Sequence, residues 1–279
     1  MCGIVGYFDK TGAEKQALGK ILLGMLEALG CRGPDSAGVA LYGIPRPHQL
    51  VARVKVGNNG GSAQRTLEIK TAAQKFGAQE FTQKGDYLRF TFGENGDLKP
   101  FLSSIESVGS DVEVVSVGRR LEIVKQVGSP SQLEQSFGIS GFRGGHGIGH
   151  TRLSTESVVD LSHSQPFWGH GYADLAIVHN GHITNYHQLR RRYEEHGVRF
   201  HTANYSEVVA IFLADKLRQG IMLRSALESM ITELDGSFSC LVATESALAF
   251  VKDSFSLKPL LYTESENFVA VAPEEISIR

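Results

Sequence analysis

Apolar residues along this chain follow two spacings, one typical of helices and one typical of strands. Between residues 18 and 29 they recur every three or four positions, which predicts an amphipathic helix ending at Gly30. Apolar runs on either side of this helix predict strands at residues 2–8 and 36–42. The chain therefore opens with a strand that starts almost at its first residue.

The stretch from about residue 46 to 145 has a different pattern of apolar and glycine residues. Short β-rich runs at 51–56, 87–92, 112–117 and 121–127 are separated by glycine-rich turns, of which the loosest is 58–61, and two helices are expected among them. No cluster typical of catalysis stands out here. We interpret this stretch as a β-rich insertion within a single domain that spans residues 1–279.

From residue 146 onward, strands and helices are again regularly spaced. Strands are expected at 146–153 and 174–178, then helices at 186–196, 206–218 and 223–234, and strands at 237–243, 247–252, 259–263 and 268–271. Strands at both ends of the chain with helices between them predict an α+β fold of packed sheets covered by helices.

Composition and charge exclude several classes of function. A net charge of −2, with no block of like charge, argues against binding to nucleic acid. No apolar run approaches the roughly 20 residues that a membrane-spanning helix needs, and no basic-then-apolar leader is present, so a cytoplasmic protein is expected. The cysteines Cys2, Cys31 and Cys240 form no C-x-x-C pair, so free thiols are expected and a bound metal or cluster is not.

Cys2 is the first candidate for chemistry. Chain termini usually fray, but the apolar run that follows Cys2 would hold this terminus in a sheet. Removal of Met1 would leave a thiol and a free α-amine on one residue. Because the pKa of an α-amine is ~7.7–8.0, against ~10.4 for lysine, the amine can accept the thiol proton and leave a nucleophilic thiolate.

Histidines are unusually concentrated in one part of the chain. Nine of the ten lie between His146 and His201, and His146 and His150 are four residues apart. That spacing could present two metal ligands on a helix, but the surrounding glycines favour a strand and no nearby carboxylate completes a ligand set. Structural or hydrogen-bonding roles are therefore the favoured interpretation.

Two further motifs allow a plain and a functional interpretation. His179-Asn180-Gly181 is typical of a turn, and taken alone the turn is favoured; alternatively, the Asn180 amide and the Gly181 N–H could form an oxyanion hole. Arg152 could be a paired surface charge, or it could grip a substrate carboxylate with two hydrogen bonds, helped by the Thr151 hydroxyl.

The motifs together are far more specific than any one alone. In order along the chain they are Met1-Cys2-Gly3-Ile4-Val5-Gly6, Arg32-Gly33-Pro34-Asp35-Ser36-Ala37-Gly38, Gly149-His150-Thr151-Arg152-Leu153-Ser154-Thr155, Gln165-Pro166-Phe167, His179-Asn180-Gly181-His182-Ile183-Thr184-Asn185, Leu234-Asp235-Gly236-Ser237-Phe238, and Lys252-Asp253 with Leu257-Lys258-Pro259-Leu260. This set resembles the class II glutamine amidotransferases over residues 1–45 and 146–279.

The resemblance implies an N-terminal-nucleophile (Ntn) hydrolase fold, a four-layer αββα sandwich of two antiparallel sheets. It also implies that Cys2 attacks the side-chain amide of glutamine and releases ammonia, with Asn180 and Gly181 as the oxyanion hole. Arg152 would bind the substrate α-carboxylate, with Thr151 and His179 beside it. Arg32 would help to order the terminal strand.

Two positions depart from the family pattern. Tyr205-Ser206-Glu207 stands where the family usually has Asp-Thr-Glu or Asp-Ser-Glu, and that Asp pairs with the substrate α-ammonium. Tyr205 therefore leaves recognition of the amino group open, unless Asn204 or an acidic residue from elsewhere substitutes. Leu153 stands where many members have an aromatic residue.

Family members usually fuse this domain to a synthase that consumes the ammonia, and no such domain is expected here. The resemblance therefore implies a hetero-oligomer with a glutamate-synthase-like partner, with N-methylglutamate synthase the preferred match. Because a subunit that passes on ammonia needs docking surface, part of 46–145 is predicted to contact the partner; a tolerated surface elaboration is the alternative. No cofactor is expected in this chain, whereas FMN and an iron–sulfur cluster are expected in partner subunits. The alternatives are a hydrolase of another γ-glutamyl amide and a non-catalytic subunit with a degenerate glutaminase fold.

Overall fold

The structure is a computed structural model that describes residues 2–12, 16–57, 62–94, 96–154 and 158–279. Met1, Thr155 and residues 58–61, where the sequence predicts a glycine-rich turn, lie outside the described residues.

The terminal strand is an inner strand of a six-stranded antiparallel sheet. The strand order is β13-β14-β1-β8-β2-β7, so β1 has a hydrogen-bonded neighbour on each side. The strands are β1 (Gly3–Asp9), β2 (Ser36–Tyr42), β7 (Leu121–Val127), β8 (His146–Arg152), β13 (Leu261–Glu264) and β14 (Phe268–Ala272). Because β1 is paired on both sides, the residue that precedes it is held in place, and the frayed-terminus interpretation does not apply.

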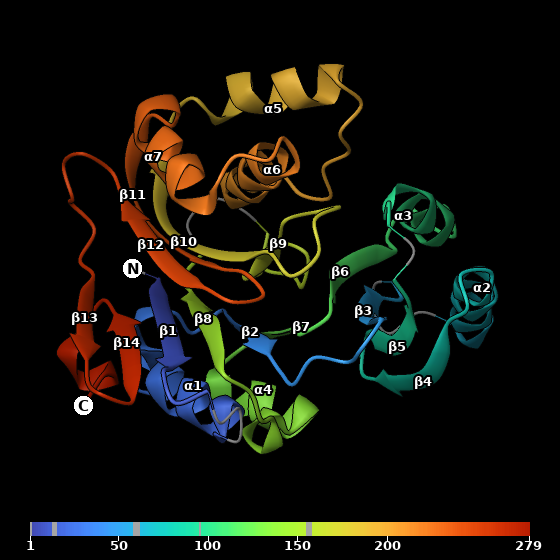
Figure 1. Cartoon of the computed structure of the whole chain (residues 1–279), viewed down its shortest axis with the longest axis horizontal. Helices are drawn as coiled ribbons and strands as arrows, with labels where there is room; N and C mark the ends of the chain where they lie inside the picture. Colours follow the sequence, from blue (N-terminus) through green and yellow to red (C-terminus); the bar gives the residue numbers. More distant parts are fainter. Residues whose placement is uncertain (1, 13–15, 58–61, 95, 155–157) are drawn as a thin grey trace.

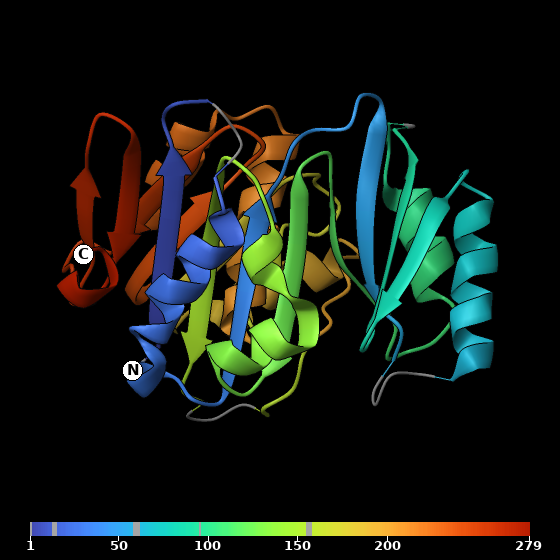
Figure 2. The ribbon, with the colours of Figure 1, turned by 90° about the horizontal axis from the view of Figure 1, so that it is seen from below.

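A second antiparallel sheet packs against the first. Its order is β12-β11-β10-β9, formed by β9 (Phe167–Trp168), β10 (Ala176–Ile183), β11 (Gly236–Ala243) and β12 (Leu248–Lys252). Helices α1 (Leu18–Glu27) and α4 (Pro130–Phe137) cover the outer face of the six-stranded sheet, and α5 (Tyr186–Glu195), α6 (Tyr205–Arg218) and α7 (Leu223–Glu233) cover the other sheet (Figures 1 and 2). Short 3-10 turns occupy Gly30–Arg32, Ile139–Gly141 and Glu275–Ser277. The predicted four-layer αββα sandwich is confirmed.

Helix α1 approaches its sheet closely because β8 is rich in glycine. A Cβ on Gly147 would lie 2.8 Å from Leu22 and one on Gly149 would lie 3.1 Å from Leu26. Both leucines are fully buried, and burial of each contributes about 1.5–3 kcal/mol. The side chains of β8 that alternate with these glycines therefore point to the other face, between the two sheets.

The inserted part is a third sheet with its own helices. It contains β3 (Gln49–Lys55), α2 (Ala63–Gln74), β4 (Gln79–Lys84), β5 (Tyr87–Gly93), α3 (Lys99–Glu106) and β6 (Glu113–Gly118), and its strand order is β4-β5-β3-β6. It stands beside the sandwich (Figure 2). We call this part the inserted sheet and the remainder the body.

The predicted end of the insertion, residue 145, is wrong. Strand β7 pairs with β2 from Tyr42↔Leu121 to Ser36↔Val127, and α4 packs on the body through Leu133. The inserted sheet therefore ends with β6. An apolar run predicts a strand but not its partner, so the pattern of β6 and β7 could not show that the two strands belong to different sheets.

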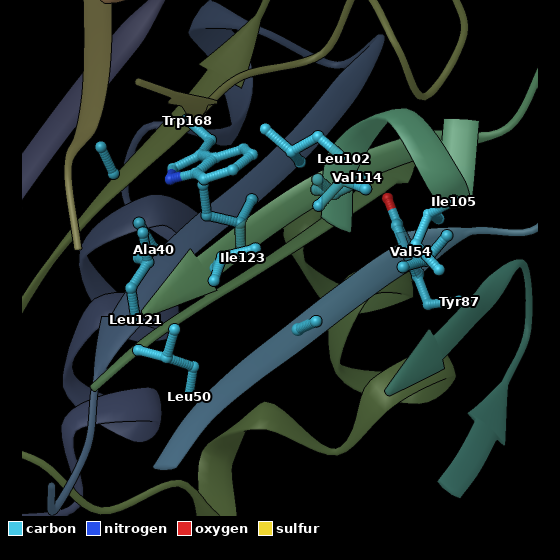
Figure 3. Close-up of a cluster of buried hydrophobic side chains, with 14 of the residues drawn as sticks. Ala40, Leu50, Val54, Tyr87, Leu102, Ile105, Val114, Leu121, Ile123 and Trp168 are labelled. Carbon is cyan, nitrogen blue, oxygen red and sulfur yellow. The ribbon is translucent and has the colours of Figure 1, made fainter. Parts of the chain in front are cut away.

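The inserted sheet and the body share one continuous apolar core. Leu102 and Ile105 of α3 lie in the same buried cluster as Trp168 of β9 and Ile123 of β7 (Figure 3). At the crossing point, the carboxylate of Asp174 accepts the backbone N–H groups of Arg119, Arg120 and Leu121 at 2.8–2.9 Å. The inserted sheet is thus a packed extension of the body.

Among the described residues, no helix is both long enough and apolar enough to cross a membrane.

Candidate active site

Cys2 directly precedes β1 and is held there by contacts to its backbone and its sulfur. Its carbonyl oxygen accepts hydrogen bonds from Arg32 Nε at 3.3 Å and from Asn180 Nδ2 at 3.1 Å. Its Sγ lies 3.4 Å from the Leu153 backbone nitrogen and 3.6 Å from the Leu153 oxygen. Arg32 is also paired with Glu274. The arginine and the asparagine that the sequence placed near Cys2 therefore both contact it.

The Cys2 side chain opens into a cavity of about 300 Å³. This volume suits a small polar substrate. The lining comes from the residue before β1, the end of β8, the segment before β9, β10, the start of α6 and the loop before β13. It comprises Cys2, Arg152, Leu153, Ser154, Gln165, His179, Asn180, Gly181, His182, Asn204, Tyr205, Ser206 and Lys258.

The motif His179-Asn180-Gly181 is not the turn that its local sequence favours. It lies within β10, which pairs with β11 without interruption from Ala176 to Ile183. Gly181 has a φ of +142°, and a Cβ there would lie 2.1 Å from the Ser237 oxygen. Only glycine fits this backbone position, and the constraint comes from β11, which local sequence cannot reveal.

His179 is a buried, neutral member of the wall. Burial lowers its pKa to about 3, and its Nδ1 lies 3.1 Å from Ser206 Oγ. Gln165 fixes the backbone here, because its amide accepts the His179 N–H at 2.6 Å and donates to the His179 oxygen at 2.9 Å. His179 therefore shapes the cavity and carries no charge near neutral pH.

Arg152 brings a positive charge to the cavity from the end of β8. Its guanidinium donates to the Val158 oxygen at 3.0 Å and to Ser154 Oγ at 3.3 Å. Partial burial lowers its pKa, but an arginine stays charged at any physiological pH. Asp35 supports the following turn by accepting the Ser154 N–H at 2.7 Å.

The prediction that Thr151 binds substrate is wrong. Thr151 does not line the cavity. Its side chain lies on the face of the sheet that α1 covers: a Cβ built on Gly3 would meet both Thr151 Oγ1, at 2.7 Å, and Leu29, at 2.9 Å. The cause is strand alternation, since neighbouring residues of a strand point to opposite faces and Arg152 occupies the cavity side.

Tyr205 stands at the first turn of α6 and lines the cavity with its ring against two histidines. Its ring centroid lies 5.6 Å from that of His179 and 5.1 Å from that of His182, both edge to face. Asn204 does not replace the missing acid, because its Oδ1 caps α6 by accepting the Ser206 N–H and its Nδ2 donates to the His163 oxygen.

The described lining holds two cations and no carboxylate. Lys258 joins Arg152 in the wall, whereas Glu207 turns away and accepts hydrogen bonds from the His201 and Thr202 backbone. Sequence reasoning missed Lys258 as a site residue, although it stands in the quoted block Leu257-Lys258-Pro259-Leu260. Gln165, Ser154 and Ser206 were missed in the same way. A site so lined favours an anionic substrate.

Comparison with known proteins agrees with this arrangement. Residues 150–278 match the family model described as a glutamine amidotransferase domain. Over 100% of its length the chain is 35% identical to a Methanothermobacter thermautotrophicus protein named as a glutamine amidotransferase, of which it covers 93%. It is 32% identical to the glutamine amidotransferase-like protein GlxB of Rhizobium meliloti, over 98% of this chain and 89% of GlxB. The chain belongs to the glutamine amidotransferase family.

Solved structures confirm the Ntn hydrolase fold of this amidotransferase. The Bacillus subtilis glutamine phosphoribosylpyrophosphate amidotransferase matches 99% of the chain with a TM-score of 0.61 at 20% identity. A structure described as the allosteric regulatory enzyme of purine biosynthesis matches with a TM-score of 0.63 at 19% identity. In both cases the present chain covers 43% of the longer chain that it matches.

The histidines of β8 are structural, as the sequence favoured. His146 stacks on Tyr42 with ring centroids 4.3 Å apart, and its Nε2 lies 2.7 Å from the Thr244 oxygen. His150 is fully buried, and burial together with Arg152 lowers its pKa to about 3. Neither arrangement is typical of a metal site.

Proposed function

We propose that this amidotransferase hydrolyses the side-chain amide of glutamine through a thioester on Cys2 and delivers the ammonia to a partner enzyme. The observation that carries this proposal is the convergence of Cys2, Asn180 and Arg152 on one cavity. They supply a nucleophile, a hydrogen-bond donor for the developing oxyanion and a cation for the substrate carboxylate.

The first chemical step transfers the thiol proton of Cys2 to its own α-amine, once Met1 has been removed. The sulfur then bonds to the amide carbon while the carbonyl electron pair moves onto oxygen. Asn180 Nδ2, which in this structure donates to the Cys2 backbone oxygen, and the Gly181 N–H would stabilise that oxyanion.

Collapse of this intermediate re-forms the carbonyl and breaks the carbon–nitrogen bond. The α-ammonium of Cys2 returns its proton to the leaving nitrogen, so ammonia departs and a thioester remains. Water then attacks the thioester, and the thiol and glutamate are released. Both steps use the same oxyanion site.

A second candidate substrate is a different γ-glutamyl amide, one whose amino group is blocked. Tyr205 and the absence of a carboxylate from the described lining favour it, because an α-ammonium would meet Arg152 and Lys258 without a counter-charge. The comparison of kcat/KM for glutamine, γ-glutamyl-methylamide and N-acetylglutamine separates the two. A strong preference for free glutamine would eliminate this candidate.

The contacts around Cys2 argue against a non-catalytic subunit. A degenerate site would have no need to retain Arg32 and Asn180 on the Cys2 carbonyl together with Gly181 in its strained position. That third candidate would be favoured only if the purified chain, alone and with its partner, released no ammonia from any γ-glutamyl amide.

We further propose that the ammonia acceptor is bound to a separate, glutamate-synthase-like subunit, of which N-methylglutamate synthase is the preferred example. FMN and an iron–sulfur cluster would then be bound by the partner subunit. Glutamine would be the substrate that this chain binds. Two relatives match along 93% and 89% of their own length, whereas the amidophosphoribosyltransferases match over only 27–35% of theirs, which supports a separate partner subunit.

The experiment is to isolate the chain from its native source under mild conditions and identify what accompanies it. Isotope-labelled glutamine, with ¹⁵N in the amide, is then supplied to the isolated complex. We expect the label in the product of the partner and only little free ammonium. Release of all label as ammonium, with no partner recovered, would contradict the delivery of ammonia.

A further inference from the structure

A cluster outside the active site joins the inserted sheet to the body. Glu106 is the last residue of α3, His170 follows β9, and His201 precedes α6. The neighbouring residues Leu102, Ile105 and Trp168 form part of the shared core (Figure 3). The three residues are far apart in sequence, so no motif could have indicated the cluster.

The ligand atoms of this cluster lie close to the spacing that a small divalent cation requires. Glu106 Oε1 lies 3.0 Å from His170 Nε2 and 3.3 Å from His201 Nε2. One atom from each residue lies within 4.8 Å of the other two. Around a zinc ion with bonds of about 2.0–2.2 Å, tetrahedral ligand atoms are about 3.3–3.6 Å apart. An ion therefore fits with small side-chain adjustments.

Burial provides an independent reason to expect a ligand. The His201 side chain is only 8% exposed, and its Nε2 lies 3.3 Å from Glu106 Oε1 without the geometry of a hydrogen bond. Coordination of both groups to one metal ion would replace this poorly aligned ion pair and satisfy the buried ring nitrogen. The Glu106 side chain is 7% exposed.

The cluster also has a route to solvent. The His170 side chain is 24% exposed, whereas its ring packs on Trp168 with centroids 5.2 Å apart. Water could therefore reach the side of the cluster that the three protein ligands leave open, and complete a fourth coordination position.

We propose that Glu106, His170 and His201 bind one zinc ion. Two imidazoles and one carboxylate are a typical ligand set for zinc, and imidazole favours zinc over magnesium or calcium. The site is separate from Cys2, so the ion takes no part in amide hydrolysis.

The zinc would hold the inserted sheet to the edge of the active-site cavity. His201 donates its backbone N–H to Glu207 Oε1 at 2.7 Å, and Thr202 donates to Glu207 Oε2 at 2.8 Å. The Asn204 N–H in turn donates to Thr202 Oγ1, and Asn204 caps the helix that begins at Tyr205. A change at the zinc would therefore reach the cavity through residues 201–205.

Zinc binding to the full chain without an affinity tag tests the proposal. Every protein carries Cys31→Ser, since the Cys31 thiol is exposed and could bind metal by itself. The metal-stripped protein is titrated with Zn²⁺ against a chromophoric chelator and, separately, with Co²⁺ while the visible spectrum is recorded. We expect one equivalent of zinc and a Co²⁺ spectrum typical of four- or five-coordinate nitrogen and oxygen ligands.

Variants locate the bound ion. Glu106→Gln and His201→Ala should each weaken zinc binding about 100-fold or more, since removal of outer partners alone costs 10–100-fold. His170→Ala serves if either buried variant fails to fold. His196→Ala, at the exposed end of α5, is the matched control and should bind as the parent does.

Loss of both zinc and the Co²⁺ spectrum in the folded ligand variants, with His196→Ala unchanged, supports the site. Absence of zinc binding in the parent, or equal binding in the parent and all ligand variants, would overturn it. In that case the cluster is an ion pair between Glu106 and protonated histidine.

Discussion

The two ends of the active-site cavity are built in different ways. The proposed reaction end, Cys2 with Asn180 and Gly181, belongs to β10 and to the residue that leads into β1, and its backbone is fixed by neighbouring strands. The recognition end, Arg152 with Tyr205 and Lys258, comes from a strand end, a helix start and a loop. Strand pairing holds the backbone of Asn180 and Gly181, whereas Tyr205 and Lys258 lie outside the sheets.

The sequence follows the same division. At the reaction end every residue matches the family motifs, because amide chemistry restricts which side chains can serve. At the recognition end Tyr205 departs from them, and Lys258 is a cation that motif reasoning had not assigned. We therefore expect changes at the reaction end to lower kcat, and changes at the recognition end to alter KM and substrate preference.

The largest effect is expected from Cys2→Ala. Removal of the proposed nucleophile should lower glutamine-dependent turnover by about 10⁴-fold or more, since loss of a nucleophile disables both chemical steps. Turnover of the partner complex with added ammonia should persist. Cys31→Ser, which removes an exposed thiol, is the matched control and should leave both rates unchanged. Full glutamine-dependent turnover in Cys2→Ala would show that Cys2 does not belong to the reaction end.

Asn180→Ala should have the next largest effect. Loss of one donor to the oxyanion should lower kcat on the order of 10²–10³-fold and change KM little. Steady-state kinetics give the separation, and the unfolding midpoint shows whether the β10 strand is intact. A fall in kcat below tenfold would remove Asn180 from this role.

Arg152→Gln should act mainly on KM. A charge-assisted hydrogen bond contributes about 1.5–3 kcal/mol, so KM for glutamine should rise about 10–150-fold while kcat changes much less. Lys258→Gln is the parallel variant and shows which of the two cations contacts the carboxylate. Equal losses of kcat and kcat/KM in Arg152→Gln would place it at the reaction end instead.

Tyr205→Asp should change only which substrate is preferred, glutamine or N-acetylglutamine. A carboxylate at this position would pair with a free α-ammonium, so the ratio of kcat/KM for glutamine to that for N-acetylglutamine should rise about tenfold. Tyr205→Phe, which adds no charge, should leave the ratio near that of the parent. An unchanged ratio in Tyr205→Asp would show that the substrate amino group lies elsewhere.

The smallest effect concerns the buried histidines behind the reaction end. The pKa of His150 is about 3 in the folded chain, below the ordinary value of 6.5, so the unfolded chain binds the extra proton first as pH falls. Stability is thus complete above pH 6.5 and decreases below it. As pH falls from 7.5 to 5.5, protonation of this histidine in the unfolded chain should lower the free energy of unfolding by about 1 kcal/mol. Denaturant titrations of parent and His150→Gln measure it, and an equal pH dependence in both would contradict the assignment.

Strand and helix positions in the body could be predicted because their apolar spacing is regular, and motif order then indicated the fold. Which sheet a strand joins could not be predicted, as β7 shows, because the choice depends on β2, which lies far away in sequence. The side that Thr151 faces could not be read from its motif, since one residue of register separates the cavity from α1. The Glu106 cluster was missed for the same reason, because packing alone brings its members together.

The central claim is that Cys2 is the nucleophile, with its own α-amine as the base. Intact-mass and peptide mass spectrometry of the chain after treatment with a glutamine-like electrophile, such as a diazo-ketone analogue, tests it most directly. We predict that Met1 is absent, that one adduct forms on Cys2, and that excess glutamine protects it while Cys31 and Cys240 stay unmodified. Retention of Met1, or an adduct on another thiol with Cys2 unreacted, would contradict the account.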